Sequence, residues 1–346
     1  MKMMKYAAVT DLKQAEVFER PVPKMGENDL LVKLYACNIC TADYGVWTGS
    51  RKKQFPVAGG HENIGIIIDK GDKVNSEFNI GDCVGFSIPF CGLCEECRNG
   101  NTIQCEHILD AIKPTEDGVS GFIGFAEYKV VNARIAVKVD PSLPFEESCF
   151  LEPLATVVHG LKKVRPTRFD NVVVIGAGTM GLLNAQVYRF YGSNVIITEM
   201  MQKKIDVAMS LGFDVIDISK DDPVEKVNLL TEGKGADLVI CAASTTSANK
   251  QAIKMLKRDN GKVLFFAAGY PAPELDIDSN QIHYRAMELI GTYDATISDF
   301  MEASKILAKR EINLKCLLEN SFSLSEIQKA FECAATPGAY RVTVRL

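Results

Sequence analysis

The first part of the chain alternates short hydrophobic runs with turn-forming residues. LLVKLYA at 30–36, IGIIID at 64–69 and AEYKVV at 126–131 have the composition of strands, and Gly, Pro, Asn and Asp separate them. Strands of this length with turns between them pack as sheets. The pattern therefore predicts a β-rich region from Lys5 to about Val139.

Between about Glu147 and Ile290 the pattern changes to apolar strands that alternate with helical periods. VVVIGAG at 172–178, VIITE at 195–199 and ADLVICAA at 236–243 are the clearest of these strands. Strands that alternate with helices predict a parallel sheet covered on both faces, so we expect an α/β chain with a doubly wound domain. Two amphipathic helices and a closing strand are expected after it, at 300–310, 324–335 and 340–346.

Length and composition fit two globular domains. The chain has 346 residues, 47% of them hydrophobic and 24% charged, enough for two cores of ordinary size. A formal charge of −5 argues against nucleic acid and against an anionic membrane surface as partners. With neither a signal peptide nor an apolar run as long as a membrane span, we expect a cytoplasmic protein, in which the 11 cysteines are not disulfides.

A glycine-rich turn follows the strand at 172–175. Gly176, Gly178 and Gly181 form GxGxxG, with Thr179 and Met180 inside it, and a helical pattern follows at once. A strand before this motif, a helix after it and an acid at the end of the next strand predict a dinucleotide site, with pyrophosphate at the helix N-terminus. The alternative is a glycine turn that binds no cofactor.

The acid of this predicted site is Glu199. Its carboxylate suits the ribose hydroxyls of NAD and repels the 2′-phosphate of NADP. We therefore expect NAD, while Lys203 and Lys204 leave NADP as the less favoured choice.

Four cysteines fall within fifteen residues. Cys91, Cys94, Cys97 and Cys105 have the spacing C-x2-C-x2-C-x7-C, which suits a structural zinc whose four coordination positions are all filled by protein. Such an ion has no position for substrate. The cluster predicts a structural zinc; an iron–sulfur cluster or four free thiols are the alternatives.

Four further motifs accompany the four cysteines and the glycine turn: Cys-x-x-Asp at 40–43, Gly-His-Glu-x-x-Gly at 60–65, Gly-Asp-x-Val at 81–84 and Glu-Pro-Leu at 152–154. Together these motifs resemble the zinc-dependent medium-chain alcohol dehydrogenases, in particular the sorbitol (polyol) and threonine dehydrogenase branch. The resemblance covers nearly the whole chain. It implies a β-rich GroES-like catalytic domain at 1–153 and 295–346, with a structural zinc lobe at 90–106, and a Rossmann NAD-binding domain at 154–294.

The same resemblance implies a second, catalytic zinc. Cys40 and His61 are its expected ligands, and Glu62 and Glu152 are the two acidic positions, of which either one ligates directly. A thiolate, an imidazole and a carboxylate leave the fourth coordination position for a substrate oxygen. Thr156 is expected beside the nicotinamide ring. Each of these side chains alone has an ordinary structural alternative, such as a buried thiol or a helix cap.

Two positions depart from the family pattern. Ala42 stands where relatives carry a hydroxyl that relays the proton, which leaves Thr41, Tyr44 or water for that role. Asp294 stands where sorbitol dehydrogenases tend to carry an arginine, so hydroxyls or an amine suit this position better than a carboxylate or phosphate. The expected walls of the substrate pocket are Tyr44, Trp47, Phe122 and Asp294; for Trp47 the alternative is the core of the first domain.

The function predicted is NAD- and zinc-dependent oxidation of a secondary alcohol (polyol, cyclitol or sugar-like) to a ketone, and the reverse, in a homodimer or homotetramer with two zinc ions per chain. Within the same class an amino alcohol, a short diol or a hydroxysteroid is the alternative. A non-catalytic NAD-binding redox sensor on the same fold is the alternative of a different class.

Overall fold

The computed structural model describes residues 2–115 and 118–346, and the chain divides into two compact units. Unit 1 comprises Met1–Ala155, Asp294–Arg310 and Leu317–Leu346, and unit 2 comprises Thr156–Tyr293 and Glu311–Cys316. The domain boundaries expected from the sequence stay a prediction. One short segment, Glu311–Cys316, packs with unit 2 although that prediction places it with the catalytic domain.

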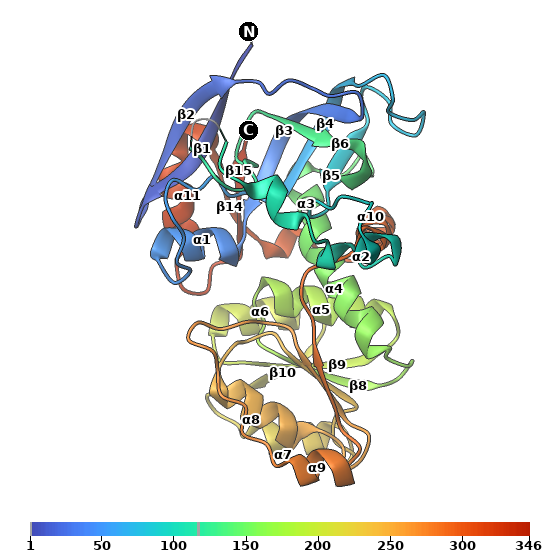
Figure 1. Cartoon of the computed structure of the whole chain (residues 1–346). Coiled ribbons are helices and arrows are strands. Elements are labelled where there is room, and N and C mark those ends of the chain that lie inside the picture. Colours follow the sequence, from blue (N-terminus) through green and yellow to red (C-terminus); the bar gives the residue numbers. More distant parts are fainter. Residues whose placement is uncertain (1, 116–117) are drawn as a thin grey trace. The chain divides into compact units, whose positions relative to one another are not determined.

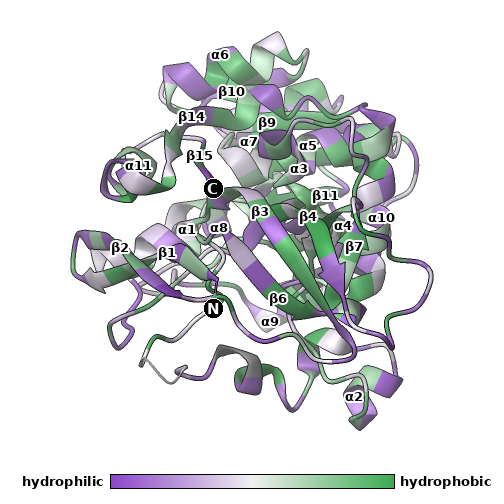
Figure 2. Cartoon of the chain, turned by 90° about the horizontal axis from the view of Figure 1, so that it is seen from above, coloured by the Kyte–Doolittle hydropathy of each residue, from purple (hydrophilic) through white to green (hydrophobic). Residues whose placement is uncertain are grey.

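Unit 1 is built on strands, as the alternating pattern predicts. A hairpin of β1 (Met3–Asp11) and β2 (Gln14–Pro21) accompanies a seven-stranded sheet. Along that sheet the order is β14 (Leu318–Ser323), β15 (Arg341–Arg345), β3 (Asp29–Ile39), β4 (Glu62–Lys70), β5 (Cys83–Phe86) and β7 (Ala136–Lys138), and β6 (Tyr128–Asn132) also pairs with β3. In Figure 2 β4 is largely in the hydrophobic colour, as suits a strand whose residues are mostly buried.

Short helices complete unit 1. They are α1 (Thr41–Thr48), α2 (Glu95–Arg98), α3 (Phe145–Ser148), α10 (Ile297–Lys309) and α11 (Ile327–Ala334), and α4 (Leu151–Val164) begins here and continues into unit 2. The last two helices of the unit and β15 confirm the elements expected near 300–310, 324–335 and 340–346. Between them lie 3-10 turns at Thr102–Gln104, Ile108–Ile112, Ala133–Ile135, Lys315–Leu317 and Leu324–Glu326.

Unit 2 holds a six-stranded parallel sheet in the order β10, β9, β8, β11, β12, β13. Its strands are β8 (Asn171–Ile175), β9 (Asn194–Glu199), β10 (Asp214–Asp217), β11 (Leu238–Cys241), β12 (Lys262–Phe265) and β13 (Glu288–Gly291); its helices are α5 (Thr179–Phe190), α6 (Gln202–Ser210), α7 (Pro223–Leu230), α8 (Thr246–Met255) and α9 (Ser279–Tyr284). Figure 1 shows α5 and α6 on one face of this sheet and α7 and α8 on the other. The doubly wound parallel sheet is confirmed.

The strand order of unit 2 locates a binding position. The chain starts at β8, moves outward through β9 to β10, and then returns to β11 on the other side of β8. At such a reversal the loops that follow the two strands diverge and leave a crevice at the carboxyl ends. The glycine turn, which follows β8 directly, lies at this reversal.

Across residues 2–115 and 118–346, the helices are each too short or too polar to cross a bilayer.

Candidate functional site

The pairing register of unit 1 brings Cys40, His61, Glu62 and Arg341 together. Asn38 in β3 pairs with Glu62 in β4, and Ile39 pairs with Val342 in β15. Cys40 directly follows Ile39, His61 directly precedes Glu62, and Arg341 directly precedes Val342. Three strand ends therefore deliver these side chains to one place, although 301 positions separate Cys40 from Arg341.

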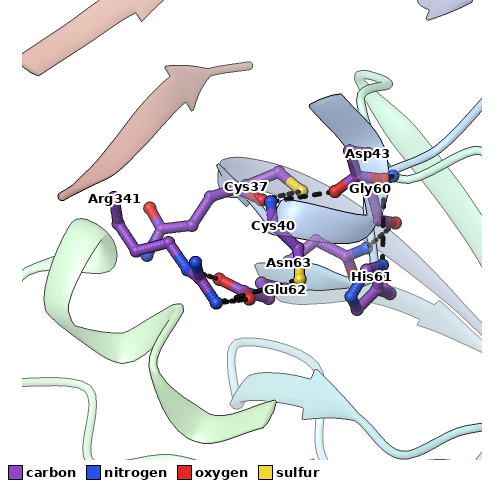
Figure 3. Close-up of polar contacts among 9 residues, drawn as sticks. Cys37, Cys40, Asp43, Gly60, His61, Glu62, Asn63 and Arg341 are labelled. Carbon is purple, nitrogen blue, oxygen red and sulfur yellow. Dashed lines mark hydrogen bonds and ion pairs between the residues drawn. The ribbon is translucent and has the colours of Figure 1, made fainter. Parts of the chain in front are cut away.

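Cys40, His61 and Glu62 form a candidate metal centre. One ligand atom from each, a sulfur, a ring nitrogen and a carboxylate oxygen, lie within 4.8 Å of one another. Figure 3 shows the Cys40 sulfur beside the Glu62 carboxylate, with the His61 ring on the other side. Three ligands of these types are what a catalytic zinc requires, so the donor set fits that metal.

Asp43 in α1 positions two segments of this centre. Its Oδ2 accepts a hydrogen bond from the backbone N–H of Cys40 at 3.0 Å, and its Oδ1 accepts one from that of Gly60 at 3.0 Å. The same Oδ1 lies 3.8 Å from Nδ1 of His61. A buried carboxylate thus ties the start of α1 to the segment that carries His61, as Figure 3 shows. The Cys-x-x-Asp motif contained this residue, but the sequence alone assigned it no role.

Arg341 was missed by the sequence analysis. Its guanidinium donates to both oxygens of Glu62, from Nε at 2.9 Å and from Nη2 at 2.7 Å, and Nη2 lies 3.8 Å from the sulfur of Cys40. Both members of this pair are buried, with Arg341 6% and Glu62 1% exposed. The one available signal was a cationic residue, Arg341, at the start of the closing strand.

The buried charges shift the ionisation of this centre. Burial raises the pKa of Cys40 to about 12, although Arg341 acts against it. Burial alone would lower the pKa of His61, but the carboxylates of Asp43, Glu152 and Glu62 outweigh it and raise the pKa. Removal from water raises the pKa of Glu152 well above its usual range, and Glu62 and Asp294 add to this shift. A divalent cation would reverse these shifts, because it favours the thiolate, the neutral imidazole and the carboxylate.

The Arg341 pair is open to a direct test. We expect Arg341→Lys to lower the free energy of unfolding by about 2 kcal/mol, because an ammonium cannot replace both hydrogen bonds to a buried carboxylate. Urea unfolding of the zinc-loaded protein measures this loss. Arg345→Lys is the matched control, since Arg345 is exposed in the same strand and should change stability by less than about 0.5 kcal/mol. Equal midpoints for the two variants would contradict a structural role for the pair.

The second cluster is the lobe of four cysteines. The sulfurs of Cys91, Cys94, Cys97 and Cys105 lie within 4.8 Å of one another, which fits a closed tetrahedral zinc site. Backbone N–H groups of Leu93 and Cys94 donate to the Cys91 sulfur at 3.3 Å each. The N–H of Cys94, followed by that of Leu93, lowers the pKa of Cys91 to about 6, so the backbone already favours a thiolate there.

In unit 2 the glycine turn has the geometry that a pyrophosphate needs. Gly176 has φ +96°, in the left-handed region, and α5 starts directly after Gly178. A Cβ on Gly181 would collide with the carbonyl oxygen of Gly176. The turn therefore requires glycine at both ends, and it exposes the N-terminus of a twelve-residue helix to an anion.

Glu199 lies next to this turn and is hydrogen-bonded to it. Its carboxylate accepts the N–H of Ala177 at 2.9 Å and those of Met200 and Met201 at 2.7 and 2.9 Å. These bonds hold the acid at the end of β9, beside the glycine turn. Lys204 also approaches, because a Cβ on Gly178 would lie 3.7 Å from its Nζ. Thr179 and Met180 form the first turn of α5.

The other predicted residues lie in different surroundings. The Phe122 ring lies 5.8 Å from that of His61. Trp47 is 6% exposed and stacks on Phe331 in the core of unit 1, which is the alternative that the sequence left open, and half-buried Tyr44 packs against the same core cluster. Thr41, at the start of α1, is exposed. The last two predicted residues are Asp294 and Thr156. Asp294 interacts electrostatically with Glu152, and Thr156 is half-buried one turn after Glu152 in α4.

Two family models match the chain. One, described as an alcohol dehydrogenase GroES-like domain, matches residues 26–141, and the other, described as a zinc-binding dehydrogenase, matches residues 179–309. Together they cover more than two thirds of the 346 residues.

Sequence similarity to known proteins covers nearly the full length of the chain. A sorbitol dehydrogenase of Halalkalibacterium halodurans is 29% identical over 94% of both chains, and an L-threonine 3-dehydrogenase of Proteus mirabilis is 28% identical over 90% of both. A crystal structure from Sinorhizobium meliloti, described as a zinc-binding dehydrogenase bound to NADP, is 25% identical and superposes with a TM-score of 0.87 over 100% of both chains.

Proposed function

The chain belongs to the zinc-dependent medium-chain alcohol dehydrogenase family, and from this premise we propose that it oxidises a polyol, cyclitol or sugar-like secondary alcohol to a ketone with NAD, and catalyses the reverse. The observation that carries the proposal is the convergence of Cys40, His61 and Glu62 within 4.8 Å. A protein that only bound NAD would have no need of an open metal centre.

We assign the zinc ligands as Cys40, His61 and a carboxylate. Glu62 is the acid within reach of the other two, and both of its oxygens also accept hydrogen bonds from Arg341. That guanidinium withdraws charge from Glu62 and so weakens it as a ligand. Glu152 is the second acid, and it would take the ligand position when Glu62 is held by Arg341.

Cys40, His61 and a carboxylate would hold a zinc ion that would supply Lewis-acid chemistry to the substrate oxygen, and a bound nicotinamide would supply the redox chemistry. The protein's own part is to bind and orient. Asp43 fixes the backbone that carries Cys40 and His61, and the Phe122 ring lies 5.8 Å from the His61 ring. Because Ala42 has no hydroxyl, the proton leaves by Thr41, which is exposed, or by water.

The proposed cofactor is NAD rather than NADP. Glu199 is 7% exposed and held by three backbone N–H groups, so it cannot easily turn away from an added 2′-phosphate. A carboxylate in this place accepts ribose hydroxyls and repels a phosphate. Lys204 reaches toward this turn, since a Cβ on Gly178 would lie 3.7 Å from its Nζ, and its charge would lessen the preference.

A substrate panel tests the proposal. With zinc loaded and with NAD or NADP, sorbitol, inositol, butanediol, threonine and a hydroxysteroid are compared by nicotinamide absorbance. We expect the highest kcat/KM for sorbitol or inositol with NAD. If threonine gave the highest kcat/KM, the substrate would be an amino alcohol instead, which would agree with the threonine dehydrogenase relatives. No turnover of any alcohol by protein with both zinc ions bound would contradict an enzymatic role.

We also propose a homodimer or homotetramer. β13 is the last strand of the parallel sheet and pairs only with β12 among the described residues. Its backbone is therefore available to the same strand of a second copy.

A further inference from the structure

Unit 1 contains a cavity that neither metal cluster explains. It has a volume of about 590 Å³ and lies between α10, β7, the 3-10 turn at Ala133–Ile135 and residues 73–78. It shares no lining residue with the Cys40 centre or with the four cysteines. Its volume is in the range of small-molecule sites, about 300–1,000 Å³.

The floor of this cavity, here called the α10 cavity, is apolar. Phe78 and Val137 are 7% and 6% exposed and belong to the lining. From α10, Ile297 and Met301 complete the apolar part, and the Met301 side chain is 50% exposed. A methionine that stays half in water beside an apolar floor offers adaptable contact to a ring or an alkyl chain.

The rim of the α10 cavity is cationic. Its charged residues are Lys73, Arg134, Lys138, Lys305 and one acid, Glu77. Two of the four cations are neutralised by acids outside the lining: Lys73 lies 2.6 Å from Glu27, and Lys138 lies 2.9 Å from Asp82. The remaining two determine what the cavity attracts.

Arg134 and Lys305 have no acidic partner among the described residues. Arg134 donates to the side-chain oxygen of Asn132 at 2.8 Å and to the backbone oxygen of Cys91, and both acceptors are neutral. Lys305 is exposed on α10 and has no ion pair with any residue in 2–115 or 118–346. With Glu77 as the one opposing charge, the lining carries an excess of positive charge.

We propose that the α10 cavity binds an organic anion with an apolar body. The carboxylate, sulfonate or phosphate lies at Lys305 and Arg134, and the ring or alkyl chain lies on Phe78, Val137 and Met301. Each half of the ligand meets a part of the lining that suits it. This site is separate from the proposed dehydrogenase chemistry.

Anilinonaphthalene sulfonate is the probe, because it is an aromatic sulfonate whose fluorescence rises in apolar surroundings. It is titrated into the zinc-loaded protein with saturating NAD, which fills the dinucleotide site. Lys305→Glu should raise the dissociation constant by about fivefold, since it reverses one exposed charge at the rim. Lys309→Glu is the matched control, one turn along the same helix, exposed and outside the lining, with an expected change of less than about twofold.

Ala133→Trp should abolish binding by filling the cavity, and Met301→Asp provides a second test of the apolar part if that variant does not fold. Decanoate should displace the probe, whereas decyltrimethylammonium, with the same alkyl chain and the opposite charge, should not. Equal dissociation constants for Lys305→Glu and Lys309→Glu would overturn the proposal. So would displacement by the substrate alcohol, or probe binding that disappears as the protein self-associates, which would indicate a second copy on this surface.

Discussion

Cys40→Ala should lower kcat/KM for the best substrate by about 10³-fold or more and leave one zinc per chain instead of two. A thiolate is the strongest of the three proposed ligands, and without it the ion that polarises the substrate oxygen is lost, a contribution of several kcal/mol to the transition state. The four-cysteine lobe should keep its zinc, because its sulfurs form a group of their own. Metal analysis and initial rates measure both effects.

The control for this variant is Cys316→Ala. Cys316 is a half-buried thiol in the segment Glu311–Cys316 of unit 2, where its sulfur lies 3.2 Å from the backbone oxygen of Asn313. This variant should hold two zinc ions and turn over normally. A Cys40→Ala protein that retains both ions and most of its turnover would remove the basis of the proposed function.

Gly178→Val should weaken NAD binding by about 100-fold while the unfolding temperature of the apo-protein changes by no more than about 2 °C. Gly178 has φ −69°, which valine adopts without strain, and an added Cβ would lie 3.7 Å from Lys204, an ordinary contact. Its methyl groups would nevertheless stand at the helix N-terminus, where the pyrophosphate is proposed to bind. Calorimetric titration with NAD and thermal unfolding of the apo-protein separate the two effects.

Gly181→Ala is the contrasting variant. Its Cβ would collide with the Gly176 carbonyl oxygen, so this substitution should lower the unfolding temperature as well as the affinity for NAD. Normal NAD affinity in Gly178→Val would place the pyrophosphate elsewhere and would contradict the proposed cofactor site.

The architecture was predictable because its signals are local. Apolar strands alternating with helical periods between about Glu147 and Ile290 predicted the parallel sheet of unit 2, and the GxGxxG motif after β8 predicted the turn that the structure has. The cluster of four cysteines was equally predictable, because Cys91 to Cys105 are close in the chain and a short loop is enough to bring their sulfurs together. Residues that are close in sequence can meet without help from the rest of the fold.

The contacts around Cys40 could not be predicted from local sequence in the same way. Trp47, a residue beside the ligand segment, could have lined the pocket, but packing against Phe331 buries it in the core. Arg341 looked like one cation in a closing strand, yet it holds the Glu62 carboxylate by two bonds. Neither outcome follows from a motif, because each depends on a partner hundreds of positions away.

By itself, then, the sequence determined the two kinds of unit and the glycine turn, and it predicted the donor types for two proposed zinc ions, because residue type and short spacing are sufficient for these. Tertiary structure alone decided that β15 lies against β3, and hence that a cation from the end of the chain balances an acid beside His61. Strand order and register depend on the packing of the whole sheet, and that packing decides which distant charges meet.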